Sequence, residues 1–110
     1  MGSNTTIVSE ALGLTAEELG LAAKGWSIKN NMLGMPVYNG NNDHLGVIED
    51  LVVTREKGIC YAIIGVGGYL GLGSYDVAIP VHRLRMSRSQ LTLPGATTES
   101  LKAIPAFKYE

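Results

Sequence analysis

The chain has 110 residues, of which 45% are hydrophobic and 17% charged, so it is long enough for one globular domain and too apolar for a disordered segment. Nine basic residues against ten acidic ones leave a net charge of −1, which excludes the strongly basic surface of a general nucleic-acid-binding protein. The single cysteine, Cys60, excludes an internal disulfide framework and a cysteine-cluster metal site.

The sequence also gives evidence on whether the chain enters a membrane and which cellular compartment it occupies. The longest apolar run, residues 59–66, is too short to span a bilayer, so we expect no membrane insertion. No basic segment followed by an apolar one opens the chain, so no signal peptide is visible. The compartment stays open: cytoplasm, or periplasm if a signal peptide has been removed.

Residues 1–31 form a predicted N-terminal extension. Residues 1–13 are polar and aperiodic, and we expect little order there. Thr15 and Glu18 have the spacing of a capping box, which predicts a short helix over about residues 16–24. A helix of this length is marginal alone, so its apolar side chains must pack on its own domain or on another chain. The sequence leaves these two alternatives open.

From residue 32 onward the apolar pattern changes to a period of two, with turn residues recurring at short intervals. The expected strands cover residues 35–38, 45–54, 59–66, 75–79, 84–86 and 91–93. Thr97 or Thr98 is expected to cap a last short helix that ends before Pro105. Residues 32–110 are therefore predicted to form an all-β domain, a small β-barrel of about six strands flanked by short N- and C-terminal helices.

A glycine-rich segment, residues 62–73, joins two of the expected strands. It fails as a dinucleotide-binding fingerprint, because the third required glycine falls on Leu70 and a strand follows instead of a helix. We interpret its glycines as structural, permitting a sharp connection between strands. These structural glycines are Gly67, Gly68, Gly71 and Gly73. The large apolar residues among them form the candidate interface, because a small barrel cannot bury them all. They are Tyr69, Leu70 and Leu72.

A divalent-metal or small-ligand site is an alternative that rests on His44, Asp43 and His82. The two histidines have neither a helical partner nor a cysteine partner, so the metal argument is weak. The turn that precedes His44 resembles a calcium loop in part, but His44 occupies the place of the required glycine and a strand follows. We expect no bound metal and no cofactor.

No catalytic constellation is visible. Glu49 and Asp50 are adjacent, so a regular strand would point them to opposite faces and they could not act as a carboxylate pair. No nucleophile-elbow motif supports a Ser-His-Asp triad. We therefore expect no enzymatic activity.

The only basic cluster comprises Arg83, Arg85 and Arg88. Strand alternation would put Arg83 and Arg85 on one face, which we interpret as a solvated face. Association with RNA or the ribosome through these arginines is a weaker alternative, and we expect no nucleic-acid partner.

The chain from about residue 32 to residue 109 resembles a PRC-barrel domain, the family named for part of the photosynthetic reaction centre H subunit, and in particular its stand-alone bacterial members. The matching segments are Leu33–Asn39, Gly46–Leu51, Gly67–Gly73, Val77–Pro80 and the ending from Leu101 through Pro105 to Phe107. The resemblance implies a small all-β barrel that acts as an adaptor for protein contacts, with no catalytic residues to carry over. It does not imply reaction-centre function.

The leading hypothesis is thus a non-enzymatic protein-interaction module. It would form a homodimer or higher homo-oligomer, bind another protein, or do both. The sequence names neither the partner nor the cellular process.

Overall fold

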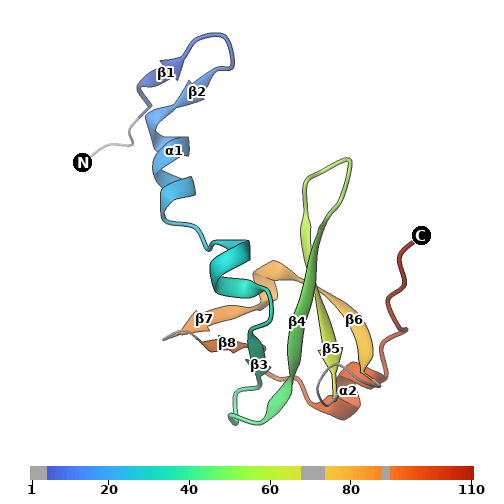
Figure 1. The fold of residues 1–110 in the computed structure, drawn as a ribbon. Coiled ribbons are helices and arrows are strands. Elements are labelled where there is room, and N and C mark those ends of the chain that lie inside the picture. Colours follow the sequence, from blue (N-terminus) through green and yellow to red (C-terminus); the bar gives the residue numbers. More distant parts are fainter. Residues whose placement is uncertain (1–4, 68–73, 88–89) are drawn as a thin grey trace.

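The computed structural model of the chain describes residues 5–67, 74–87 and 90–110. It shows two parts, which we call the N-terminal arm (residues 5–24) and the sheet domain (residues 28–104) (Figure 1). The radius of gyration is 16.7 Å, whereas a compact domain of 100 residues has a value of about 13 Å. The arm accounts for the difference, because it extends away from the sheet domain (Figure 1).

The arm consists of a hairpin and a helix. Strands β1 (Ile7–Ser9) and β2 (Leu14–Thr15) pair antiparallel, and α1 (Ala16–Ala23) follows directly. The predicted capping box is confirmed: the Thr15 N–H donates to the Glu18 carboxylate at 2.9 Å, and the Glu18 N–H donates to Thr15 Oγ1 at 3.2 Å. The expectation of little order over residues 1–13 is wrong from residue 7 onward, because strands of two or three residues are too short to show a period.

The sheet domain is built on one six-stranded sheet with the order β6-β5-β4-β3-β8-β7. Its strands are β3 (Pro36–Tyr38), β4 (His44–Val53), β5 (Cys60–Val66), β6 (Tyr75–Pro80), β7 (Arg85–Ser87) and β8 (Gln90–Thr92). All six predicted strands are confirmed to within one residue at each end. The pairs are antiparallel except β3 with β8, which run parallel with Val37 opposite Leu91.

The all-β class is confirmed, but closure of the sheet into a barrel is not. Within the described residues the strand order is linear, and β6 and β7 form its two ends without pairing with each other. A short 3-10 turn, η2 (Val81–Arg83), leads from one end to the other (Figure 1). Barrel closure therefore stays a prediction, and within the described residues β6 and β7 are the two unpaired edges of the sheet.

The core lies against one face of the curved sheet. Alternation along β5 turns Ala62, Ile64 and Val66 into it, all with no exposed surface. The other buried core residues are Met32, Val37, Leu45, Ile48, Val77, Ile79, Leu84, Leu91, Leu93 and Leu101. Met32 comes from η1, a short π-helical turn (Ile28–Met32), and Leu101 from α2 (Thr98–Lys102), so these two elements cover the ends of the core.

The C-terminal residues return to the sheet. The Phe107 N–H donates to the Asp76 carbonyl of β6 at 2.8 Å, and the Tyr109 hydroxyl donates to the Asp50 carboxylate of β4. The Phe107 and Tyr109 rings pack edge to face, with their centroids 4.9 Å apart. None of the helices in the described ranges is both long enough and apolar enough to cross a membrane.

Candidate functional site

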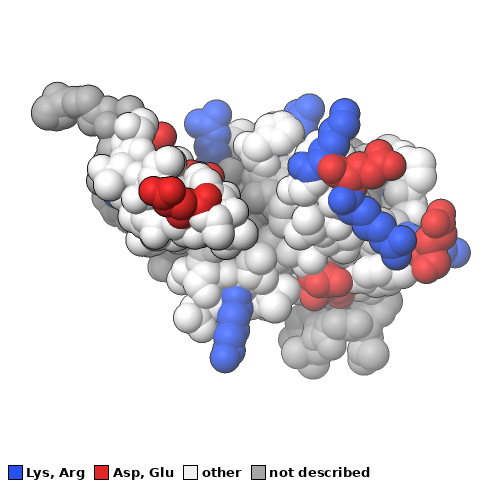
Figure 2. Space-filling view, turned by 90° about the horizontal axis from the view of Figure 1, so that it is seen from above, with Lys and Arg blue, Asp and Glu red and all other residues white. Residues whose placement is uncertain are grey.

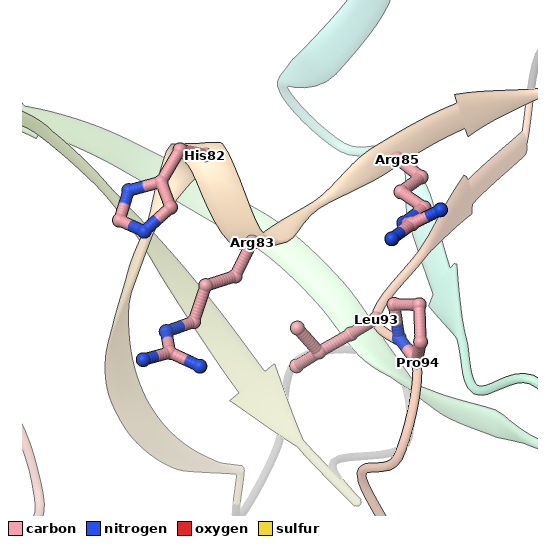
Figure 3. Close-up of a pocket in the computed structure, with 5 residues that line it drawn as sticks. All are labelled: His82, Arg83, Arg85, Leu93 and Pro94. Carbon is pink, nitrogen blue, oxygen red and sulfur yellow. The ribbon is translucent and has the colours of Figure 1, made fainter.

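A hollow of about 360 Å³ opens beside η2, at the place where the sheet stays open. It is lined by His82, Arg83, Arg85, Leu93 and Pro94. Figure 3 shows the Arg83 side chain, from η2, and the Arg85 side chain, from β7, on the two sides of Leu93, with their guanidinium groups apart from each other. Among the described residues that line this hollow there is no Asp or Glu, so its electrostatic character is positive.

A second, more apolar hollow of about 420 Å³ adjoins the first. One wall is the end of β6, from Ala78 to Pro80, and the other is the segment Leu93–Ala96 that leaves β8, with Ile104 beside them. The two hollows share Arg83, Leu93 and Pro94. We call the combined depression the seam groove: its basic end holds His82, Arg83 and Arg85, and its apolar end lies between β6 and the residues that follow β8.

The first wall is held by the way β6 ends. Pro80 has no N–H to continue the strand, and it occupies the position directly before the η2 turn with φ −55°. The Leu84 N–H donates to the Val81 carbonyl at 2.9 Å, and the Leu84 side chain is buried in the core. These two anchors fix the turn that carries Arg83.

The second wall is held by the parallel pairing of β3 and β8. The Leu93 N–H donates to the Tyr38 carbonyl at 2.7 Å, which continues the ladder past the end of β8. Asn39 is only 6% exposed, and its side-chain N–H donates to the Ala96 carbonyl at 3.1 Å. Both sides of the seam groove are therefore built into the domain, which favours a site that exists before a ligand binds.

The seam groove has the chemistry of binding. Arginine guanidinium groups present paired N–H donors that match carboxylate geometry, and Arg83 and Arg85 are both exposed. Alanine, isoleucine and proline at the other end offer an apolar surface to side chains of the same kind. None of the described lining residues is a serine, threonine, cysteine or carboxylate that could act as a nucleophile with His82.

The metal and ligand candidates from the sequence are not brought together. The His44 ring packs edge to face on Tyr38, with the ring centroids 5.5 Å apart. The Asp43 carboxylate accepts a hydrogen bond from the Asn39 side chain at 3.2 Å. His82 lies in the seam groove instead. Within the parts of the chain that the structure describes, no three His, Cys, Asp or Glu side chains form a metal-binding group.

The candidate interface Tyr69, Leu70 and Leu72 lies outside the described residues, as do Gly68, Gly71 and Gly73. Gly67 is described and has φ +69°, a conformation that favours glycine. A Cβ there would lie 3.0 Å from Lys102 Nζ.

The structure brings Arg83 and Arg85 to one hollow, while Arg88 lies outside the described residues. Sequence reasoning treated these arginines as a solvated face and missed the wall opposite them. The turn dipeptide Pro94-Gly95 was a local signal that the chain changes direction there, and Gly95 does have φ +80°. Nothing local, however, indicates that this turn faces η2.

Carboxylates gather on the outer face of the sheet. The register of β4 with β5 shifts between Ile48 and Asp50, so Glu49 is a bulge residue, and the expectation of a regular alternation at this point is wrong. Glu49 lies against Gly65, which has no side chain, and the Ser74 hydroxyl lies 3.3 Å from Glu49 and 3.2 Å from Asp76. The hydrogen bond with Asp76, then burial and charge repulsion from Asp76, raise the pKa of Glu49.

Comparisons with known proteins place this architecture in a family. The family model described as PRC-barrel domain matches residues 29–95, which is more than half of the chain and includes all six strands of the sheet. A comparison with curated proteins finds no match. The resemblance expected from the sequence is thereby confirmed. The chain belongs to the PRC-barrel domain family, and this membership indicates a small domain with an interaction-type role.

Proposed function

We propose that the chain is a non-enzymatic protein-interaction module whose docking surface is the seam groove. The observation that carries this proposal is the groove itself, in which a basic end adjoins an apolar end at an opening of the sheet. A protein segment that fits both ends carries carboxylates next to apolar side chains.

The two ends contribute differently to binding. A Leu- or Ile-sized side chain that leaves water for the apolar end contributes about 1.5–3 kcal/mol. An exposed arginine–carboxylate pair contributes about 0–1 kcal/mol, but its charge speeds encounter and rejects basic partners. Affinity is therefore assigned mainly to the apolar end and selectivity to Arg83 and Arg85.

The absence of an enzymatic role is supported by the reactive groups that the chain does carry. Cys60 is half-buried, and burial raises the pKa of its thiol, which lowers the fraction of reactive thiolate at neutral pH. The two histidines lie in different surroundings, one against Tyr38 and one beside Arg83.

The test is an NMR titration of the isotope-labelled full chain with two synthetic helical peptides that share one leucine pattern. One peptide carries glutamates around the leucines, and the other carries lysines at the same positions. The acidic peptide is expected to shift the amide signals of Ala78, Leu93 and Ala96, and the basic peptide is not. Equal shifts with both peptides, or none with either, would refute the proposal.

The residues Tyr69, Leu70 and Leu72 remain a second predicted contact. The same titration on a Leu70→Asp/Leu72→Asp chain tests it. Loss of binding with an intact fold supports a contact that extends beyond the seam groove, and unchanged binding removes these residues from the interface.

A further inference from the structure

The N-terminal arm carries apolar side chains that its own chain does not cover. No residue of α1 is buried. Five large apolar residues of the arm are exposed by 50% or more: Ile7, Val8, Leu12, Leu19 and Leu21. A single exposed leucine is ordinary on a protein surface, but a run of five within fifteen residues marks a surface that another element covers.

The elements of the arm also need such a cover to be stable. An isolated two-stranded hairpin is at best marginal in water, and helices shorter than about 12 residues are marginal even with good helix formers. The hairpin and α1 are nevertheless hydrogen-bonded and capped. Burial of the apolar side chains of the arm on another surface would supply the missing free energy.

The connection to the sheet domain points the arm away from its own body. The Gly25 N–H donates to the Ala22 carbonyl at 3.1 Å at one end of the connector, and the Ser27 N–H donates to the Asn31 side chain at 3.0 Å at the other. Trp26, between them, lines a hollow with Met35 and Met86 of the sheet domain. Figure 1 shows the arm leaving beyond η1, on the side away from β6.

The arm and the seam groove have opposite charge. Over residues 5–24 the arm contains three acidic residues, Glu10, Glu17 and Glu18, against one basic residue, Lys24, at its end. In Figure 2 acidic side chains show on the end of the molecule that carries the arm, and basic and acidic side chains lie together over the opposite end. The arm thus has the composition that the seam groove selects, with carboxylates next to leucines.

We propose that the N-terminal arm of one chain docks in the seam groove of a second copy, and that a reciprocal exchange of arms closes a two-fold dimer. This inference rests on the seam groove proposed above and names its partner. Exchange of an identical element is a low-cost route to a dimer, and two-fold symmetry doubles every contact. The arm and the groove together supply about the 20–30 residues per side that a stable interface needs.

Sedimentation velocity of the full chain tests the exchange. For the wild-type chain, the mass obtained is expected to rise with protein concentration from 11.7 kDa to twice that value. Leu19→Asp/Leu21→Asp, which removes the apolar contact of the arm, should raise the dimer dissociation constant about 100-fold or more. Arg83→Glu/Arg85→Glu, which reverses the charge of the groove, should raise it about 10-fold. Ile59→Asp is the control, since Ile59 is an exposed apolar residue that lies outside the arm and lines neither hollow of the groove, and it should leave the constant unchanged.

Two rescue experiments separate docking from misfolding. An equimolar mixture of the arm variant and the groove variant should form a mixed dimer, because one chain keeps an intact groove and the other an intact arm. A chain with Glu10→Lys/Glu17→Lys and Arg83→Glu/Arg85→Glu together should recover most of the lost affinity. Glu18 is left in place because it completes the capping box of α1.

Other outcomes overturn the inference. A wild-type chain that stays at a single-chain mass at all concentrations refutes the exchange, and so does a dimer that survives both sets of substitutions. Protection of arm amides in a single-chain species would show that the arm folds back onto its own groove. In each case the peptide titration, repeated on the Leu19→Asp/Leu21→Asp chain, still reports whether the seam groove binds acidic apolar segments.

Discussion

The two α-helices of this protein begin in the same way and end up in different surroundings. Both have a capping box, with Thr15 and Glu18 in α1 and with Thr97 and Ser100 in α2. The longer helix, α1, buries none of its residues, whereas the five-residue α2 buries Leu101 to 3% exposure. A cap therefore determines where a helix begins, but contact with the core determines which helix is part of the folded domain.

The same contrast holds for the arm and the sheet domain as wholes. The buried apolar residues of the described chain lie between Met32 and Leu101, and the exposed large apolar residues are concentrated before residue 34. Local hydrogen bonds are satisfied in both parts. What separates them is the burial of apolar surface, the dominant favourable term in folding. Substitutions in the two parts should therefore have different effects.

The largest difference is expected for truncation of apolar side chains. Ile64→Ala should lower the free energy of unfolding by about 2–5 kcal/mol, because it leaves a cavity in the core. Leu21→Ala in α1 should change it by less than about 0.5 kcal/mol at protein concentrations where the chain is a single molecule. Urea denaturation of both variants measures this. Similar losses for the two would show that the arm belongs to the same core.

Two glycines give a second comparison. A Cβ on Gly46 would collide with the backbone of Gly65 on the neighbouring strand, so Gly46→Ala should destabilise the sheet domain by about 1–3 kcal/mol. Gly20 of α1 has no atom near its Cβ position, and Gly20→Ala should stabilise the helix by up to about 1 kcal/mol. Thermal denaturation measures the destabilisation by Gly46→Ala, and far-ultraviolet circular dichroism measures the helix stabilisation by Gly20→Ala. A stable Gly46→Ala chain would contradict the close approach of β4 and β5.

The two capping threonines provide a matched pair. Removal of a cap costs about 0.5–2 kcal/mol of helix stability. For Thr97→Ala the loss should appear in global unfolding, since α2 docks on the core through Leu101. For Thr15→Ala it should appear only as faster amide exchange within α1. Hydrogen exchange on both variants decides this, and a global effect of Thr15→Ala would argue against an independent arm.

The smallest effect concerns pH and should be confined to the sheet domain. The raised pKa of Glu49 means that the folded chain binds a proton more tightly than the unfolded chain, whose glutamate has a pKa near 4.5. Stability is then lost as the pH rises from about 4.5 through the folded-state pKa. Glu49→Gln, or Asp76→Asn, should flatten this decline in urea midpoints measured between pH 4 and pH 7. An unchanged decline in both variants would refute the coupling of the two carboxylates.

Much of the sheet domain could be predicted because its signals are local. Alternating apolar residues and turn residues identified all six strands, and two capping threonines located both α-helices. The bulge at Glu49 could not be predicted, because one extra residue leaves the apolar pattern of a long strand almost unchanged. The hairpin before α1 was missed because its strands have only three and two residues.

The candidate site was less accessible to sequence reasoning. Arg83 and Arg85 were recognised as a pair, but the wall opposite them depends on the pairing of Val37 with Leu91, residues far apart in the chain. The apolar side chains of α1 were recognised as needing a partner, yet their exposure could be seen only once every other element had been placed. Neither fact is contained in the residues of one segment.

The sequence by itself therefore determined the class of the fold and the position of each strand, because period, turn and cap are properties of neighbouring residues. It indicated the family through a resemblance carried by several spaced motifs. Only the tertiary structure decided that β6 and β7 end the described sheet without pairing, that a basic and apolar groove lies between them, and that the arm is left uncovered. The physical reason is that burial is a property of the whole packed chain. Two equally well-capped helices can differ in it completely.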